Sequence, residues 1–424
     1  MKSRTNITRR TLLGSAAALA VGGVLLARKS DRGGAHDDYF GRLTQALRTA
    51  GVAQPVLVID RTRLHQNIEA VARTLEGASL ALRIVVKSLP APKLIDEIAS
   101  RLATTRYMVF NGPMLLDMAK QHAQADLLLG KPLPVQAARQ FYAAMNASAQ
   151  SFTEPQWLID SPERLRQYTQ LARERDRALR VNFEIDVGIH RGGAASPQAL
   201  TAMMRTAQSE PKLIVSGLMG YDAHVPRMPF VDRAWRSSQD SYAAAVDAMR
   251  RSLGECAAQL TLNCAGSPTY FMHAQGTVGN DIAVGSAFVK PTDFDLDTLA
   301  HHIPAVFIAT PVIKSLNRTR IPGLESLTGL RRFLDPNTGR AFFIYGGHWL
   351  ARPESPPGLE FSDLYGRSSN QELLMGSSSV KLRPDDFVFF RPTQSEAVLL
   401  QFGDLLVYED GNITERWPTF SVSA

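Results

Sequence analysis

The chain has little cysteine and no long apolar segment, and both shortages restrict what it can be. Only Cys256 and Cys264 occur among 424 residues, too few for a disulfide framework to hold the fold together. The longest apolar run covers residues 12–26 and is shorter than the roughly 20 residues that a membrane-spanning helix needs. Internal repeats and low-complexity tracts are also missing. With 45% hydrophobic and 21% charged residues, the composition is that of a globular protein of about two domains.

The net charge of +7 would favour an anionic partner if the excess of basic residues were spread over the folded body. It is confined to the N-terminus instead. Residues 1–30 hold six basic residues and no acidic one, so the rest of the chain has 41 basic and 40 acidic residues. A near-neutral body argues against a nucleic-acid partner.

Residues 1–35 have the pattern of a twin-arginine export signal. Arg9 and Arg10 stand between Thr8 and Thr11, directly before the apolar run. The alternatives are an ordinary signal or a short membrane anchor. We predict an exported, periplasmic protein that meets a membrane only through an uncleaved signal segment. Ala27 and Ala35 each end a small-residue cleavage site, so the position of cleavage stays open.

Short apolar runs alternate with amphipathic segments from residue 55 onward, as in βαβ units around a parallel sheet. Residues 55–59 form the first predicted strand, and Asp60 is placed to cap the helix after it. Ser161 and Ser196 each precede a proline and so predict two further helix starts. Further strands are predicted at residues 82–86, 107–110, 126–129, 156–159, 181–185, 213–218, 259–262 and 282–289. The count predicts an α/β protein with a TIM-like (β/α)8 barrel over residues 55–295.

After about residue 300 helical periodicity fades, which predicts a mainly β C-terminal domain over residues 300–424 that residues 36–54 could join. Its predicted strands are residues 305–309, 341–345, 387–390 and 405–408. Residues 317–335 and 352–366 are predicted to be loops, because Pro353, Pro356 and Pro357 oppose regular structure in the second of them.

Lys87 stands at the end of the predicted strand 82–86. A lysine that projects from a barrel strand into the interior loses hydration, which favours the neutral amine that forms a Schiff base. Most lysines are solvated, so this position alone does not establish a function. The apolar strand 181–185 carries Glu184, followed closely by Asp186 and Arg191. Such a group is either a structural ion-pair network or the mouth of a site where Arg191 meets an anionic or phenolic oxygen.

Four motifs in order resemble the D-threonine aldolase and D-serine dehydratase family, within the alanine racemase-like fold (fold type III) of pyridoxal phosphate (PLP) enzymes. They occupy residues 184–193, 217–224, 264–270 and 285–286, so the resemblance covers about residues 55–290. By this resemblance Lys87 is the lysine that carries PLP. The family assignment also places Arg191 near the phenolic oxygen of the cofactor and Tyr221 near its pyridine edge.

The glycine-rich motifs are, by the same resemblance, the phosphate side of the cofactor site. A glycine-rich turn before a helix suits a phosphate group. The implied phosphate contacts are Gly266, Ser267, Thr269, Gly285 and Ser286. His224 is either a group that touches substrate or transfers a proton, or a structural histidine.

The C-terminal domain continues the resemblance but departs from it at the family's metal pair. Gln394 and Glu396 stand where the family has a histidine followed by a cysteine or an aspartate. A neutral amide is a weak ligand for zinc, although Glu396 could still hold a hard cation. We therefore predict no tightly bound metal, which puts metal-assisted lyase chemistry in doubt.

The resemblance implies a PLP-dependent enzyme acting on a small amino acid, with a lyase of aldolase or dehydratase type as the first hypothesis. The substrate would be a D-amino acid or a β-hydroxy amino acid. An amino acid racemase, or a non-catalytic PLP-binding protein, remains an alternative. A homodimer is possible, and the exact substrate, its stereochemistry and the oligomeric state stay open.

Overall fold

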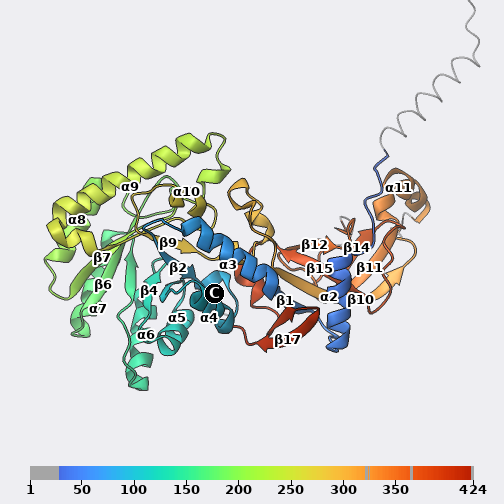
Figure 1. Cartoon of the computed structure of the whole chain (residues 1–424), viewed down its shortest axis with the longest axis horizontal. Helices are drawn as coiled ribbons and strands as arrows, with labels where there is room; N and C mark the ends of the chain where they lie inside the picture. The colour runs from blue at the N-terminus through green and yellow to red at the C-terminus, as the bar shows by residue number, and fades with distance from the viewer. Residues whose placement is uncertain (1–27, 320–322, 324, 363–365, 422–424) are drawn as a thin grey trace, which may run out of the picture. The chain divides into compact units, whose positions relative to one another are not determined.

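The computed structural model describes residues 28–319, 323, 325–362 and 366–421, and within them the chain forms two compact units (Figure 1). One unit combines the chain up to Val56 with Ile308–Arg391 and Asp410–Ile413. The other combines Leu57–Phe307 with Pro392–Glu409 and the chain from Thr414. The apolar run of the predicted export signal, residues 12–26, lies outside the described residues.

The second unit contains a closed barrel of parallel strands, which confirms the predicted fold class. Strand β2 pairs with β3 on one side and with β9 on the other, so the sheet closes on itself. The barrel strands are β2 (Ala81–Val85), β3 (Arg106–Val109), β4 (Asp126–Leu129), β5 (Gln156–Ile159), β6 (Leu179–Ile185), β7 (Leu213–Gly220), β8 (Thr261–Cys264) and β9 (Asp281–Val284). Their side chains are buried almost throughout, as expected for strands that are covered on both faces.

Amphipathic helices flank the barrel strands in Figure 1; the first of them, α3, follows β1, and the others each follow a barrel strand. They are α3 (Arg61–Leu75), α4 (Pro92–Arg101), α5 (Gly112–Gln121), α6 (Val135–Ser148), α7 (Pro162–Glu174), α8 (Pro197–Gln208), α9 (Val231–Leu253) and α10 (Tyr270–Ala274). The predicted caps are confirmed, because Asp60, Ser161 and Ser196 each accept a hydrogen bond from a backbone N–H in the first turn. Among the described helices, none combines the length and the apolar character that crossing a membrane requires.

Short 3-10 turns connect several of these elements and carry parts of the pocket described below. They are η1 (Val86–Ser88), η2 (Val225–Arg227), η3 (Gly254–Gln259), η4 (Ser286–Phe288), η5 (Thr292–Phe294) and η6 (Asp297–Leu299). The same unit also contains α12 (Glu396–Leu399).

The first predicted strand does not belong to the barrel. Strand β1 (Val56–Asp60) pairs in parallel with β16 (Leu405–Glu409), placing Leu57 opposite Leu405. All five residues of β1 are buried. Its apolar sequence therefore indicates a buried parallel strand but not the sheet that it joins. The prediction that the barrel starts at residue 55 was wrong, because it included this strand among the barrel strands.

The mainly β unit begins with α2 (Asp38–Thr49), and β11 pairs with β10 and β14 in its sheet. The strands are β10 (Val306–Leu316), β11 (Arg340–Tyr345), β12 (Ala351–Ser355), β13 (Glu360–Phe361), β14 (Gln371–Gly376), β15 (Phe387–Pro392) and β17 (Asn412–Trp417), of which β10, β15 and β17 continue into the barrel unit. Short helical pieces η7 (Glu325–Leu327), α11 (Thr328–Leu334) and η8 (Pro336–Thr338) complete it.

Both predicted loops of this unit contain regular structure. Strand β12 includes Pro353, and within the described part of the chain it pairs with β15 at the edge of the sheet. Proline cannot donate a ladder hydrogen bond, but a strand at the edge of a sheet does not need every donor. Helix α11 occupies part of residues 317–335, so the prediction of a loop over the whole of that stretch was wrong.

A buried ionic network ties several barrel strands together. Arg83, fully buried on β2, donates to Asp281 at 2.8 Å and to Asp126 at 2.7 Å. These two aspartates are the first residues of β9 and β4. Burial raises the pKa of Asp126, but the Arg83 guanidinium outweighs it and holds that pKa at about 2. The network therefore stays ionised around neutral pH.

Candidate active site

A pocket lies at the carboxyl ends of the barrel strands, the end at which barrel enzymes carry their active sites. Each of its main polar residues follows a different strand. Lys87 comes after β2, Arg191 after β6, Tyr221 after β7, Gly266 after β8 and Gly285 after β9. The barrel thus brings together side chains that are up to about 200 positions apart in the sequence.

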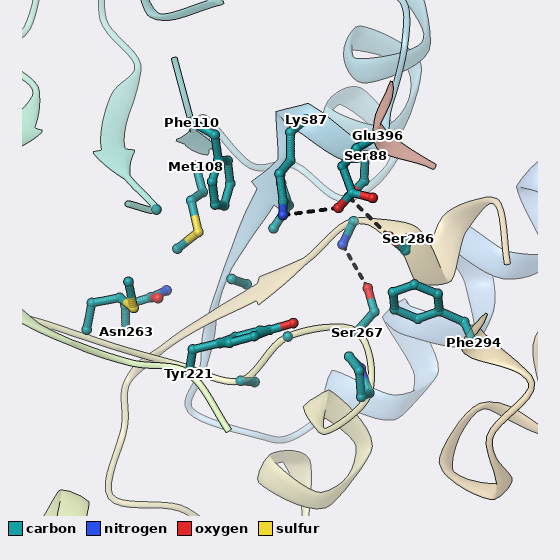
Figure 2. Close-up of a pocket in the computed structure, with 18 of the residues that line it drawn as sticks. Lys87, Ser88, Met108, Phe110, Tyr221, Asn263, Ser267, Ser286, Phe294 and Glu396 are labelled. Atoms are coloured by element: carbon teal, nitrogen blue, oxygen red, sulfur yellow. Dashed lines mark hydrogen bonds and ion pairs between the residues drawn. The ribbon is translucent and has the colours of Figure 1, made fainter. Parts of the chain in front are cut away.

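Lys87 points into this pocket from η1 (Figure 2). Its Nζ lies 3.0 Å from Glu396 Oε1 and 4.4 Å from the centre of the Phe110 ring. About a third of each side chain of the ion pair is exposed, 36% for Lys87 and 34% for Glu396. The lysine is therefore reachable from solvent, and its only charged partner recorded among the described residues is one carboxylate.

Glu396 reaches the pocket because the start of its helix is fixed there. It is the first residue of α12, and the preceding Ser395 shares a hydrogen bond of 2.9 Å with Ser286. Ser286 in turn donates to Ser88 at 3.1 Å. This chain of three buried hydroxyls joins the Glu396 turn to the residue next to Lys87.

Arg191 and Tyr221 form a stacked pair at another wall of the pocket. The guanidinium carbon of Arg191 lies 4.8 Å from the centre of the Tyr221 ring, within the range of a cation–π interaction. Burial raises the pKa of Tyr221. The positive charge of Arg191 lowers this pKa, and the negative charge of Glu396 raises it further. Gly266 leaves room for the ring, because a Cβ there would lie 2.5 Å from Tyr221 Cε2.

The glycine-rich segment after β8 is held by its own hydroxyl groups. Ser267 Oγ accepts from the backbone N–H of Gly285 at 3.1 Å and of Ala287 at 3.0 Å. Thr269 Oγ1 accepts from Gly266 N at 3.3 Å and donates to Asp222 at 2.6 Å. These bonds connect the segment both to the turn after β9 and to a buried carboxylate.

Asp222 also contacts His273, whose Nε2 lies 2.8 Å from Asp222 Oδ2 in the buried interior. Burial lowers the pKa of His273, but Cys264 and Asp222 outweigh it and raise the value to about 10. The side chain of Cys256, the second cysteine, lies outside the described side chains.

Seven of the predicted site residues line the pocket together. They are Lys87, Arg191, Tyr221, Gly266, Ser267, Gly285 and Ser286. Thr269 is not in the lining, because it lies beneath the segment and binds Asp222. His224 is also outside it and packs near the loop at Gly188, where a Cβ would lie 3.2 Å from its Nε2.

The two acidic residues of the 184–193 motif, Glu184 and Asp186, have different surroundings. Glu184 is buried, and its pKa is raised by that burial while Arg191 opposes the rise. Asp186 closes the turn after β6 by accepting from the backbone N–H groups of Gly188 and His190.

Sequence reasoning missed Ser88, Met108, Phe110, Asn263 and Phe294 in the lining. Only Ser88 carried a signal, since it is adjacent to Lys87.

The two residues at the predicted metal positions are engaged elsewhere. Gln394 Nε2 donates to Asp293 Oδ2 at 3.1 Å, and Glu396 pairs with Lys87. Across the described residues, no three or more histidine, cysteine, aspartate or glutamate side chains gather in a way that could hold a metal ion.

The donor set fits PLP. The pocket offers one amine for its aldehyde, a guanidinium beside a tyrosine ring, and a turn of glycines and serines for an anionic phosphate. Gly285 is required by close packing, because a Cβ there would lie 2.7 Å from Val85 Cβ. The structure therefore combines a closed parallel barrel, a lysine-bearing pocket at the carboxyl ends of its strands and a second, mainly β unit.

The chain belongs to the alanine racemase N-terminal domain family, whose model matches residues 59–291. Members of this family are PLP enzymes. No curated protein sequence matches the chain significantly.

Solved structures share the fold over most of the chain at low identity. D-threonine aldolase from Filomicrobium marinum has a TM-score of 0.68 at 16% identity, covering 86% of this chain and 96% of its own. D-threo-3-hydroxyaspartate dehydratase from Delftia sp. HT23 has a TM-score of 0.63 at 15% identity, covering 87% and 98%. Alanine racemase from Bacillus anthracis has a TM-score of 0.64 at 11% identity, covering 86% and 98%. The similarity includes both lyases and a racemase, and at these identities it establishes the fold alone.

Proposed function

We propose that the protein is a PLP-dependent enzyme that acts on amino acids, and specifically a lyase of the aldolase or dehydratase type for a D-amino acid or β-hydroxy amino acid. The observation that carries the proposal is the Lys87 amine, which points into a pocket that also holds Arg191, Tyr221 and the glycine–serine turns. Bound PLP would supply an electron sink for chemistry at the α-carbon of the substrate.

The residues of the pocket take separate roles in this proposal. Lys87 binds the cofactor covalently and later acts as a base. Arg191 lies over Tyr221 and offers its guanidinium to an oxygen of the cofactor. The glycine–serine turns at residues 266–267 and 285–286, which Ser267 ties together, bind the phosphate.

The placement of the Lys87–Glu396 pair on one side of the pocket supports the lyase part of the proposal. Racemisation removes a proton from one face of the α-carbon and returns one to the other, so it needs two groups on opposite sides. Lys87 and Glu396 lie 3.0 Å apart and so form one unit on one side of the pocket. Tyr221 lies across the pocket in Figure 2, with Arg191 over its ring, and in this proposal it contacts the cofactor.

Incubation of purified, PLP-loaded protein with a panel of D- and L-amino acids tests the proposal. Release of an aldehyde or a keto acid from a D- or β-hydroxy amino acid is the expected result. Inversion of configuration without cleavage would make the protein a racemase. Bound PLP without any turnover would favour the alternative of a non-catalytic PLP-binding protein.

Cofactor binding is tested separately by Lys87→Ala. Wild-type protein should take up PLP with an absorbance band near the edge of the visible range, and borohydride should attach the cofactor irreversibly to Lys87. The variant lacks the only amine among the described pocket residues, so it should show neither the band nor the attachment. A wild-type protein that takes up no PLP would refute the assignment.

A further inference from the structure

Glu396 is placed to exchange a proton with the reactive amine of the pocket. Its Oε1 is 3.0 Å from Lys87 Nζ, a hydrogen-bond distance that needs no movement of either side chain. Figure 2 shows the carboxylate directed at the amine from the side opposite Met108 and Phe110. On its other side Lys87 contacts the Phe110 ring, 4.4 Å from its Nζ.

The position of Glu396 is determined by the pocket itself. The Ser395–Ser286–Ser88 hydroxyl chain joins the start of α12 to the turn after β9 and to η1. All three serines are buried, whereas Glu396 is a third exposed. The carboxylate can therefore pass a proton on to water while its backbone stays fixed.

The charge of Glu396 also affects Tyr221, on the opposite wall of the pocket. Its negative charge contributes to the raised pKa of Tyr221, after burial and against Arg191. A carboxylate whose field reaches Tyr221 faces the interior of the pocket and not only the amine beside it.

We propose that Glu396 is a catalytic residue that accepts the proton of Lys87 and returns it. The inference rests on the proposed function. At physiological pH an isolated lysine is an ammonium ion, which has no lone pair with which to form a bond. In the proton transfer an N–H bond of Lys87 breaks and an O–H bond of Glu396 forms, so ammonium and carboxylate become amine and carboxylic acid. The freed Nζ lone pair would then bond to the aldehyde carbon of bound PLP, and the aldehyde oxygen would leave as water with the two protons of the amine. Glu396 would return its proton to the nitrogen of the new C=N bond, which restores the carboxylate.

The test compares the rate of covalent PLP uptake by the full-length apoprotein, followed by absorbance, in wild type, Glu396→Gln and Glu396→Asp. Without the carboxylate the proton must leave to solvent, so we expect Glu396→Gln to take up PLP at least tenfold more slowly. Added formate or acetate should restore that rate in proportion to its concentration and leave the wild-type rate unchanged. Glu396→Asp keeps the carboxylate and should lie between the two.

Glu69→Gln is the matched control, because Glu69 forms an exposed ion pair with Arg73 on α3, outside the pocket. It should behave as wild type, and circular dichroism should show that all variants are folded. A Glu396→Gln rate equal to wild type, or a slow rate that formate and acetate do not restore, would overturn the inference while leaving the proposed function in place. Failure of wild-type protein itself to take up PLP would overturn the proposed function instead.

Discussion

At the scale of single residues, Gly266 shows how close packing supports the pocket. A methyl group there would lie 2.5 Å from Tyr221 Cε2, far inside van der Waals contact. Either the ring or the segment after β8 must then move, and overpacking of this kind costs about 1–3 kcal/mol. We therefore expect Gly266→Ala to weaken PLP binding by roughly tenfold or more, since about 1.4 kcal/mol corresponds to a factor of ten.

Equilibrium titration with PLP, followed by quenching of protein fluorescence, measures this loss. Gly41→Ala on α2 is the matched control, because no atom lies within 4 Å of the added methyl group. It should leave the affinity unchanged. Equal affinities for the two variants would mean that the Gly266 segment does not contact the cofactor.

The absence of a tightly bound zinc ion is a second prediction at this scale. Gln394 donates to Asp293, and Glu396 is neutralised by Lys87, so neither is free to coordinate. An amide and a single paired carboxylate bind a borderline-soft ion weakly. Elemental analysis of protein purified without chelator should find less than one zinc per chain, and chelators should leave activity unchanged. A stoichiometric metal that is lost in Glu396→Gln would contradict this prediction and restore the metal-assisted lyase.

At the scale of elements, the contact between Asp222, which follows β7, and His273 on α10 holds the segment after β8. Asp222 follows β7, His273 lies on α10, and Thr269 joins both to Gly266. The pKa of His273 is raised from 6.5 to about 10 in the folded state. A raised pKa means that this stabilisation is complete below about pH 6.5 and is lost as the pH rises toward 10.

Asp222→Asn should therefore destabilise the protein most at pH 6, by about 3 kcal/mol because a buried ion pair loses one partner. The loss should be smaller at pH 9. Urea denaturation at both pH values, compared with the exposed Asp247→Asn, measures it. A loss that is the same at both pH values would show that His273 is neutral in the folded protein.

At the scale of the whole molecule, we propose export through the twin-arginine route. The described chain is a folded protein with a cofactor-type pocket, and the Arg9–Arg10 pair precedes it. A protein that binds its cofactor in the cytoplasm is already folded when it is exported. Its export therefore requires a route that carries folded proteins. Replacement of both arginines by lysine should keep the protein in the cytoplasm with its PLP, as measured by cell fractionation and immunoblotting. Unchanged export of the double variant would refute the proposal.

The sequence by itself predicted the barrel, because each of its strands is a short buried run and each helix that follows has an apolar face. It also placed Lys87, Arg191, Tyr221 and the glycine–serine turns in one site through their family motifs. Local patterns of this kind depend on neighbours in the chain, so they can be recognised without coordinates.

Only the tertiary structure shows which residues distant in sequence contact one another. Strand β1 has the same buried pattern as a barrel strand, and only its pairing with β16 removes it from the barrel. Glu396 resembled a lost metal ligand in the sequence, and only the approach of α12 to η1 places its carboxylate 3.0 Å from Lys87. The physical reason is the same in both cases: burial leaves a mark on the local pattern, whereas the identity of a contacting group depends on how elements more than 300 residues apart pack together.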